Sequence, residues 1–307
     1  MKTVRPGVAR VALVMIMLCI AVAMPLALGG CGTPASSAAS AQPSAAAASG
    51  EPCAAAASAS PAAATAPDGT PMKTIGVIGG VSWVSSEQYY RQMNEAMRDR
   101  FGPNYSAPIL MYSIPFGEFA KQEKQAAEGD WAPLRATMAD AGRRLGEGRA
   151  DFIVIASNTM NSTADLVEQA AGIPVLRIQD AVGAAVKASG VRKVALLGTA
   201  YTMEEGFYRD RLEQKYGLEV VTPDEAERDY INRIIFDELC AGRFTDAARR
   251  RYVGIIERLV REEGAQGVIL GCTEIPLLVK QKDVSVPVFD STALHTAAAV
   301  KCSLSEE

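Results

Sequence analysis

An internal repeat constrains the fold of this chain more than any other feature of its sequence. Gly79 and Ser157 each follow a short apolar run and lie 78 positions apart, and in the second half Gly198 and Cys272 follow similar runs 74 positions apart. Shorter matches keep the same order, pairing 89–91 with 207–209 and 173–176 with 286–289. A supersecondary unit duplicated in this way predicts two similar lobes.

Short apolar runs rich in β-branched residues alternate with helical stretches over the repeated part. These runs lie at 74–78, 109–112, 152–156, 174–178, 194–197, 219–221, 268–270 and 286–289. Strands without a polar side are typical of parallel sheets covered by helices on both faces. We therefore expect an α/β fold with two similar lobes, each a mostly parallel sheet flanked by helices. A pseudo-twofold axis would relate the lobes, with the active site between them.

The first helix of the repeat can be read in some detail. Ser85 and Gln88 have the spacing of a capping box, which predicts that a helix begins there. Tyr89, Met93 and Met97 follow at intervals of four, so they share one helix face. We expect this face to pack in the core.

The N-terminal part of the chain has the layout of a bacterial lipoprotein. Basic residues precede an apolar run at 11–28 that leads into Leu-Gly-Gly-Cys31. This pattern predicts a signal peptide with a lipobox at 1–31 and lipidation of Cys31, although a run of this length can also span a bilayer as a permanent helix. The segment 32–71 is almost entirely small residues and proline, which predicts a disordered tether. We expect a lipid-anchored protein on the extracytoplasmic face of the cell membrane.

The rest of the chain is long enough for both lobes. We expect the first lobe at 72–172, completed by 286–302, and the second at 173–285. The net charge is −4 and no cluster of lysines and arginines is visible in the folded part, so no nucleic-acid partner is expected. The chain has six cysteines, without a Cys-x-x-Cys motif, and His295 is its only histidine. We therefore expect no metal site, and interpret Cys240 and Cys302 as structural.

Two candidate reactive residues occupy corresponding places in the repeat. Ser157 and Cys272 each follow an apolar run, and ligands of parallel sheets bind beyond the carboxyl ends of the strands. A pseudo-twofold axis would bring the two side chains face to face across a cleft. Polar residues that can hold a small molecule follow directly: Asn158, Thr159, Thr273 and Glu274. Inverting an α-carbon requires two such facing acid/base groups.

Several short motifs resemble the aspartate/glutamate racemase family over residues from about 73 to 300. They are Gly-Gly-Val-Ser-Trp at 79–83, Ser-Asn-Thr-Met at 157–160, Gly-Thr-x-Tyr-Thr-Met-Glu at 198–204, Asp-Glu-Leu-Cys at 237–240 and Gly-Cys-Thr-Glu-Ile at 271–275. The resemblance implies a two-lobed α/β enzyme that racemises an amino acid with paired thiols and no cofactor, often as a homodimer. It makes Cys272 one base, places Ser157 where the other base stands, and adds Ser82 to the substrate pocket.

Some positions depart from the pattern of the family. Most members have cysteine in place of Ser157, and close relatives have a basic residue in place of Ala200. Asn161 and Val84 also differ from the residues usual there. A serine hydroxyl is not ionised near neutral pH, whereas a thiol titrates near 8.5. We therefore expect slow or direction-biased racemisation, and a site open to neutral or other side chains.

Other interpretations remain open at this point. The same cleft would suit a lipoprotein that binds an amino acid without turning it over, or a related isomerase or hydrolase acting on an aryl-malonate, a maleate or a hydantoin-like ring. Cys272 can also be a buried small hydrophobe. Ser157 can be a helix cap, and Glu274 can serve either the substrate ammonium or its own helix.

Overall fold

The computed structural model describes residues 64–67, 69 and 71–305. The expected signal peptide at 1–31, its lipidation site Cys31 and most of the expected tether lie outside the described residues. The end of the tether differs from the expectation of disorder, because Ala66 is buried in the core of the first lobe and the Met72 amide donates to the Ala64 carbonyl. In the part of the chain described, no helix has the length and apolarity needed to cross a membrane.

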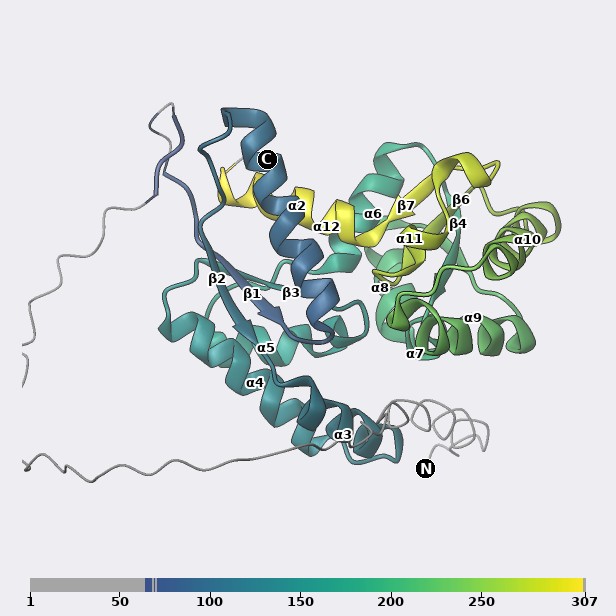
Figure 1. Ribbon diagram of the computed structural model, residues 1–307, viewed down its shortest axis with the longest axis horizontal. Helices are drawn as coiled ribbons and strands as arrows, with labels where there is room; N and C mark the ends of the chain where they lie inside the picture. The colour runs from purple at the N-terminus through teal and green to yellow at the C-terminus, as the bar shows by residue number, and fades with distance from the viewer. Residues whose placement is uncertain (1–63, 68, 70, 306–307) are drawn as a thin grey trace, which may run out of the picture.

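The first lobe contains a parallel three-stranded sheet in the order β2-β1-β3. Its strands are β1 (Ile75–Gly79), β2 (Ile109–Ser113) and β3 (Phe152–Ile155). Its helices are α2 (Trp83–Phe101), α3 (Phe116–Ala127), α4 (Ala132–Glu147), η1 (Thr159–Thr163) and α5 (Ala164–Ala171). Residues of α3, α4 and α5 form the core on one face of the sheet, and α2 covers the other face (Figure 1).

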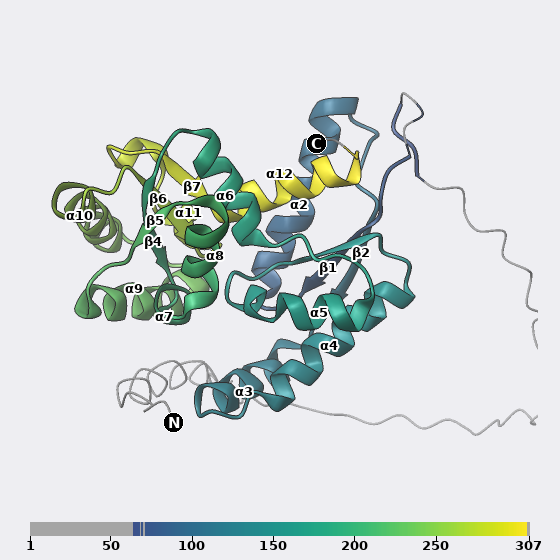
Figure 2. The ribbon, with the colours of Figure 1, turned by 180° about the vertical axis from the view of Figure 1, so that it is seen from behind.

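The second lobe contains a parallel four-stranded sheet in the order β5-β4-β6-β7. Its strands are β4 (Lys193–Gly198), β5 (Glu219–Val221), β6 (Gly267–Gly271) and β7 (Val288–Asp290). Its helices are α6 (Ile178–Ala188), α7 (Ala200–Glu204), α8 (Gly206–Tyr216), α9 (Glu225–Asp237), η2 (Leu239–Ala241), α10 (Asp246–Glu263), α11 (Ile275–Leu278), η3 (Gln281–Asp283) and α12 (Ser291–Ser303). Helices α6 and α8 cover one sheet face, as Figure 2 shows from behind, and α9 and α10 cover the other.

The two sheets have the same strand order, which confirms the duplicated α/β architecture. Strands β2, β1 and β3 correspond to β5, β4 and β6, and Val175 forms a parallel bridge beside β3 where β7 lies beside β6. The lobe boundaries differ from the expected ones for two segments. The segment after 173 was expected in the second lobe but pairs with the first sheet, and the segment after 286 was expected in the first lobe but pairs with the second sheet. Both are short apolar runs, and the sequence alone does not say which sheet edge each one meets.

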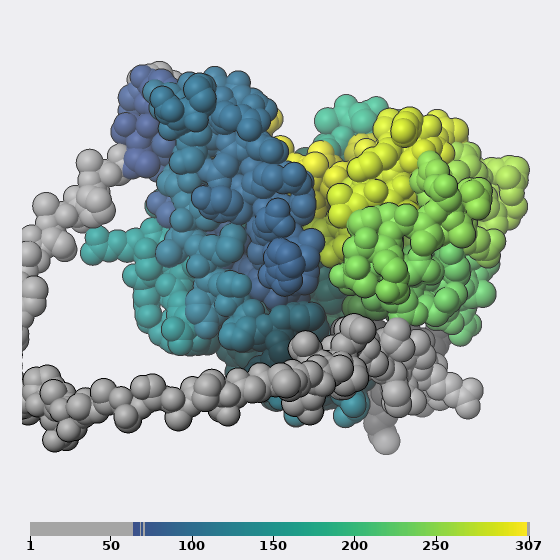
Figure 3. All heavy atoms as spheres, in the orientation of Figure 1, coloured from purple at the N-terminus to yellow at the C-terminus, as the bar shows by residue number. Residues whose placement is uncertain are grey.

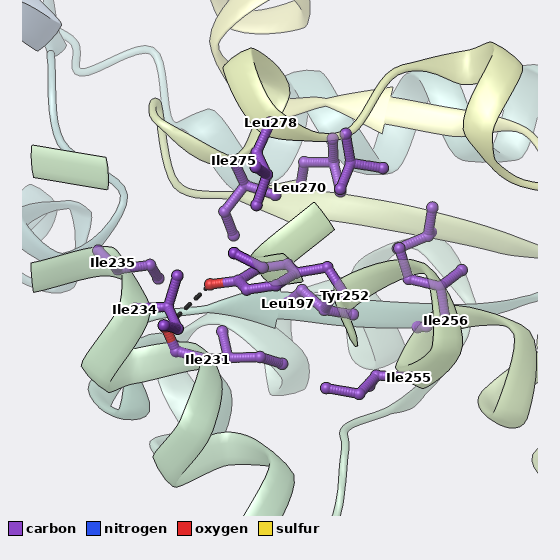
Figure 4. Packing of buried hydrophobic residues seen from close by; sticks show 14 of the residues in the cluster. Leu197, Ile231, Ile234, Ile235, Tyr252, Ile255, Ile256, Leu270, Ile275 and Leu278 are labelled. Carbon is purple, nitrogen blue, oxygen red and sulfur yellow. Dashed lines mark hydrogen bonds between the residues drawn. The ribbon is translucent and has the colours of Figure 1, made fainter. Parts of the chain in front are cut away.

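The larger core of the second lobe surrounds Tyr252 of α10. Its ring lies among aliphatic side chains of the sheet and of α9 and α11, and its hydroxyl donates to the Ile231 carbonyl at 2.9 Å (Figure 4). The hydrogen bond satisfies a buried hydroxyl that would otherwise destabilise an apolar cluster. This core holds β6 and α9, whose ends reach the boundary between the lobes.

Helix α12 joins the two lobes. It packs against α2 of the first lobe and α6 of the second, and Figure 3 shows it in yellow where the two lobes meet. His295 of α12 is fully buried there, with its Nδ1 2.8 Å from the Tyr89 hydroxyl and its Nε2 2.7 Å from the Leu176 carbonyl. Burial lowers the pKa of His295, so the imidazole is neutral at pH 7 and carries one hydrogen. Because the Leu176 carbonyl can only accept, this hydrogen is on Nε2, and Nδ1 accepts from Tyr89. The imidazole ties three segments together.

Protonation of His295 should weaken the fold at mildly acidic pH. Burial lowers the pKa of His295 from 6.5 to about 4, so the unfolded chain binds a proton that the folded chain rejects between these values. Lowering the pH from 7.5 to 5 should cost roughly 2 kcal/mol of unfolding free energy through this group. Urea unfolding of the wild type and of His295→Gln at both pH values measures it. An equal pH dependence in the two proteins would contradict this role.

Candidate active site

A cavity of about 110 Å³ lies between the lobes, at the carboxyl ends of β1, β3, β4 and β6. Its wall includes all seven residues expected at the site: Ser82, Ser157, Asn158, Thr159, Cys272, Thr273 and Glu274. Parallel strands place their following residues at one edge of a sheet, and the second lobe presents its matching edge to the first. Residues from the two halves of the repeat therefore meet in one cavity.

The turn after β1 is held by a close backbone approach. Gly80 has φ +90°, and a Cβ atom there would lie 2.2 Å from the Ile114 carbonyl oxygen. Its amide donates to the Ser86 hydroxyl at 2.7 Å. The turn places Ser82 at the N-cap of α2, without a side-chain capping bond. Helix α2 thus begins at Trp83, before the position expected from the capping-box spacing.

Ser85 makes a contact between the lobes instead of capping a helix. It is buried in the first turn of α2, and its hydroxyl lies 2.8 Å from the Thr273 hydroxyl of the second lobe. Tyr89, Met93 and Met97 behind it have no exposed surface, which confirms the expected core face of this helix.

Ser157 follows β3 and is partly buried. Its hydroxyl oxygen accepts from the Met160 amide at 3.3 Å, as a helix-capping serine does. Asn161 steadies the same turn, since its side-chain amide donates to the Ser157 carbonyl at 2.7 Å and its Oδ1 accepts from the Ile178 amide at 3.1 Å. The capping contact uses the oxygen of Ser157 only as an acceptor, so the hydroxyl hydrogen remains available to donate.

Cys272 follows β6 and donates to a carboxylate. Its thiol lies 2.9 Å from Glu274 Oε2, and the Thr273 hydroxyl donates to the same oxygen at 2.7 Å. Burial raises the pKa of the Cys272 thiol well above its usual value, and the charge of Glu274 and the neighbouring Cys240 raise it further. Cys272 is therefore a thiol at neutral pH, with Glu274 placed to accept its proton.

Asn158 lines the cavity and has a buried acceptor. Its Nδ2 donates to the Ser291 hydroxyl at 3.1 Å, and that hydroxyl donates to the Leu270 carbonyl at 2.9 Å. Its Oδ1 is buried and has no hydrogen-bond partner among the described residues. A buried acceptor costs free energy until a donor reaches it, so this atom favours a ligand that brings an N–H or O–H group.

Nine further residues that were not expected from the sequence line the cavity. They are Val81, Ser85, Phe116, Glu123, Thr199, Ile235, Phe236, Cys240 and Gly271. Burial raises the pKa of Glu123 to about 7. Nothing in the sequence around Glu123 distinguishes it from the other acidic residues of its helix. Cys240 lies in the family-like motif at 237–240, but we interpreted this cysteine as structural. Cys240 is instead exposed at the cavity.

The fold and the site define a two-lobed parallel α/β protein with a cavity between corresponding strand ends. The sequence profile of the Asp/Glu/Hydantoin racemase family matches residues 78–299, and the chain belongs to this family. No cluster of three or more potential metal ligands occurs among the residues described.

Several known proteins are similar to this chain in sequence or fold. A Yersinia pestis structure assigned to the Asp/Glu racemases is 45% identical, with a TM-score of 0.71 over 76% of this chain and 100% of that one. An aspartate racemase homologue from Pyrococcus horikoshii OT3 is 41% identical, with a TM-score of 0.67 over the same shares. The broad specificity amino-acid racemase RacX of Bacillus subtilis is 20% identical over 75% of this chain and 98% of that protein.

Proposed function

We propose that this protein is an amino-acid racemase that needs no cofactor and works by proton transfer on both faces of the α-carbon. The observation that carries the proposal is that Ser157 and Cys272, from corresponding strand ends of the two lobes, line one cavity. Two proton-handling groups around one small cavity are what inversion requires. Membership of a racemase family supports the same reaction.

The proposed cycle begins with the thiol of Cys272. Its proton passes to Glu274, and the thiolate then removes the α-proton, leaving a carbanion. The Ser157 hydroxyl donates its proton to the opposite face of this carbanion, and Cys272 keeps the proton that it removed. The proton held by Glu274 then passes through water to the Ser157 oxygen, which restores both side chains. In the reverse direction Ser157 must first lose its proton, which is harder because a hydroxyl is a much weaker acid than a thiol. The two directions should therefore differ in kcat and KM, while kcat/KM stays equal because enantiomers have equal free energies.

The polar wall of the cavity supports the orientation of an amino acid. Asn158 Oδ1 and the Glu274 carboxylate can accept from the α-ammonium group. The hydroxyls of Ser82 and Thr159 can donate to the α-carboxylate. Holding both groups fixes the α-hydrogen toward one of the two proton-handling residues.

Chiral chromatography tests the proposal. The purified protein is incubated with each L- and D-amino acid, and the other enantiomer is measured with time. We expect at least one amino acid to be interconverted, with exchange of its α-hydrogen in deuterated water. Tight binding with neither interconversion nor exchange would support a binding lipoprotein instead and would refute the racemase.

We also propose that Cys31 is lipidated and holds the protein on the extracytoplasmic face of the membrane, where two copies associate. The lipobox-like sequence before this cysteine supports the anchor. Cys31→Ser should move the protein from the membrane fraction to the soluble fraction. Retention of the variant in membranes would contradict the anchor, and the molar mass from light scattering tests the dimer.

A further inference from the structure

The charges around the cavity are all of one sign. Glu123 and Glu274 both line it, and none of the described lining residues is a lysine or an arginine. An amino acid with an acidic side chain would bring a second carboxylate without meeting a cation. We propose that the substrate is an amino acid whose side chain ends in a cation, and that the Glu123 carboxylate binds this cation. This inference rests on the proposed racemase and names its substrate class.

Glu274 and Glu123 have different surroundings. The Glu274 carboxylate already accepts from Cys272 and from Thr273. Glu123 lies on α3 of the first lobe, and its carboxylate has no ion pair or hydrogen bond with any described residue. A partly buried carboxylate without a partner is costly, and a bound cation is the partner that offsets this cost.

The protonation of Glu123 agrees with this assignment. The titratable groups that share its cavity are Cys240, Cys272 and Glu274, and none of them is a cation. Burial therefore sets the pKa of Glu123 near 7 in the free protein. A cation within about 4–6 Å favours the ionised carboxyl, so binding should release a proton.

Apolar side chains accompany Glu123. Phe116, Ile235 and Phe236 line the same cavity and offer contact to the methylene stem of a long side chain. The position where close relatives carry a basic residue adds no charge here, because it is occupied by the buried Ala200, whose amide donates to Asn232 Oδ1 at 2.9 Å. The wall thus suits the stem and ammonium of lysine or ornithine better than glutamate.

Lysine, norleucine and glutamate provide a matched set for the test. Norleucine keeps the aliphatic stem of lysine without the terminal ammonium, and glutamate carries the opposite charge. We expect kcat/KM for lysine to exceed that for glutamate by roughly 100-fold or more, as an ion pair that is partly desolvated would give. Glu123→Gln should lower the ratio of lysine to norleucine kcat/KM at least tenfold. Glu118→Gln, an exposed carboxylate on the same helix, is the control and should leave the ratio unchanged.

Calorimetry separates the substrate class from the racemase reaction. Lysine binding at pH 7, titrated in two buffers of different ionisation enthalpy, should release protons to solvent in the native protein, because burial raises the pKa of Glu123 to about 7 and a bound cation lowers it. No release is expected from Glu123→Gln. Lysine binding with this signature but without turnover would refute the racemase and keep the inference.

Three results would overturn the inference. The first is turnover or binding of glutamate equal to that of lysine in the native protein, which needs no variant to fold. The second is an equal loss of lysine and norleucine activity in Glu123→Gln, which would make Glu123 a proton-handling or structural residue. The third is proton release that persists in that variant.

Discussion

Cys272→Ala should reduce racemisation and α-hydrogen exchange by roughly 10³-fold, the scale of a lost acid/base group. The thiol has a proton acceptor built into the structure, because Glu274 Oε2 lies 2.9 Å from its sulfur. Alanine fills part of the same space but can neither take nor give a proton. Initial rates by chiral chromatography, together with deuterium exchange followed by NMR, measure the loss.

Cys302 provides the matched control for this substitution. It is a partly buried thiol of α12 that packs beside the core of the first lobe and does not line the cavity. Cys302→Ala should retain turnover within about twofold, since small changes away from a site have small effects. If Cys272→Ala kept most of its activity, the assigned role of the thiol would be wrong.

Ser157→Cys should raise turnover roughly 10- to 100-fold, toward the two-thiol arrangement usual in the family. A thiol is a much stronger acid than a serine hydroxyl, so the group on this face could both give and take the α-proton. Sulfur accepts hydrogen bonds weakly, so the variant should lose some of the contact from the Met160 amide and about 0.5–1 kcal/mol of stability. Values of kcat in both directions and a urea titration measure these effects.

Ser157→Ala separates the two interpretations of this serine. As a proton donor to the α-carbon, Ser157 cannot be replaced by alanine without a large loss of kcat. As a helix cap only, it can be, and the cost would appear in stability alone. An unchanged kcat in Ser157→Ala, or a lower kcat in Ser157→Cys, would remove Ser157 from the mechanism.

Much of the fold can be predicted from the repeat. Short apolar runs occur in the same order in both halves of the chain, which predicts two matching parallel sheets. The strand orders β2-β1-β3 and β5-β4-β6 agree with this prediction. The lobe boundaries could not be predicted, because a short run such as the one around Val175 or β7 pairs wherever a sheet edge is open. That choice depends on tertiary packing, which a local pattern does not contain.

The residues of the candidate site could also be predicted only in part. The motifs at 79–83, 157–160 and 271–275 place seven residues that do line one cavity, because each motif lies at or after the end of a strand. Glu123 and Phe116 could not be found in this way. Both residues lie on α3, which reaches the cavity through tertiary packing. No motif in the sequence of α3 indicates that it lies near the site.

The central claim is that an amino acid in this cavity is contacted on its two faces by Ser157 and Cys272. The fate of the α-hydrogen during the first turnovers in deuterated water tests it most directly, using an amino acid identified by the chiral screen. With two facing groups, the product enantiomer should carry solvent deuterium while the remaining substrate stays unlabelled. Product that retains the original hydrogen, or label entering the substrate as fast as the product, would show that one group serves both faces and would contradict the claim.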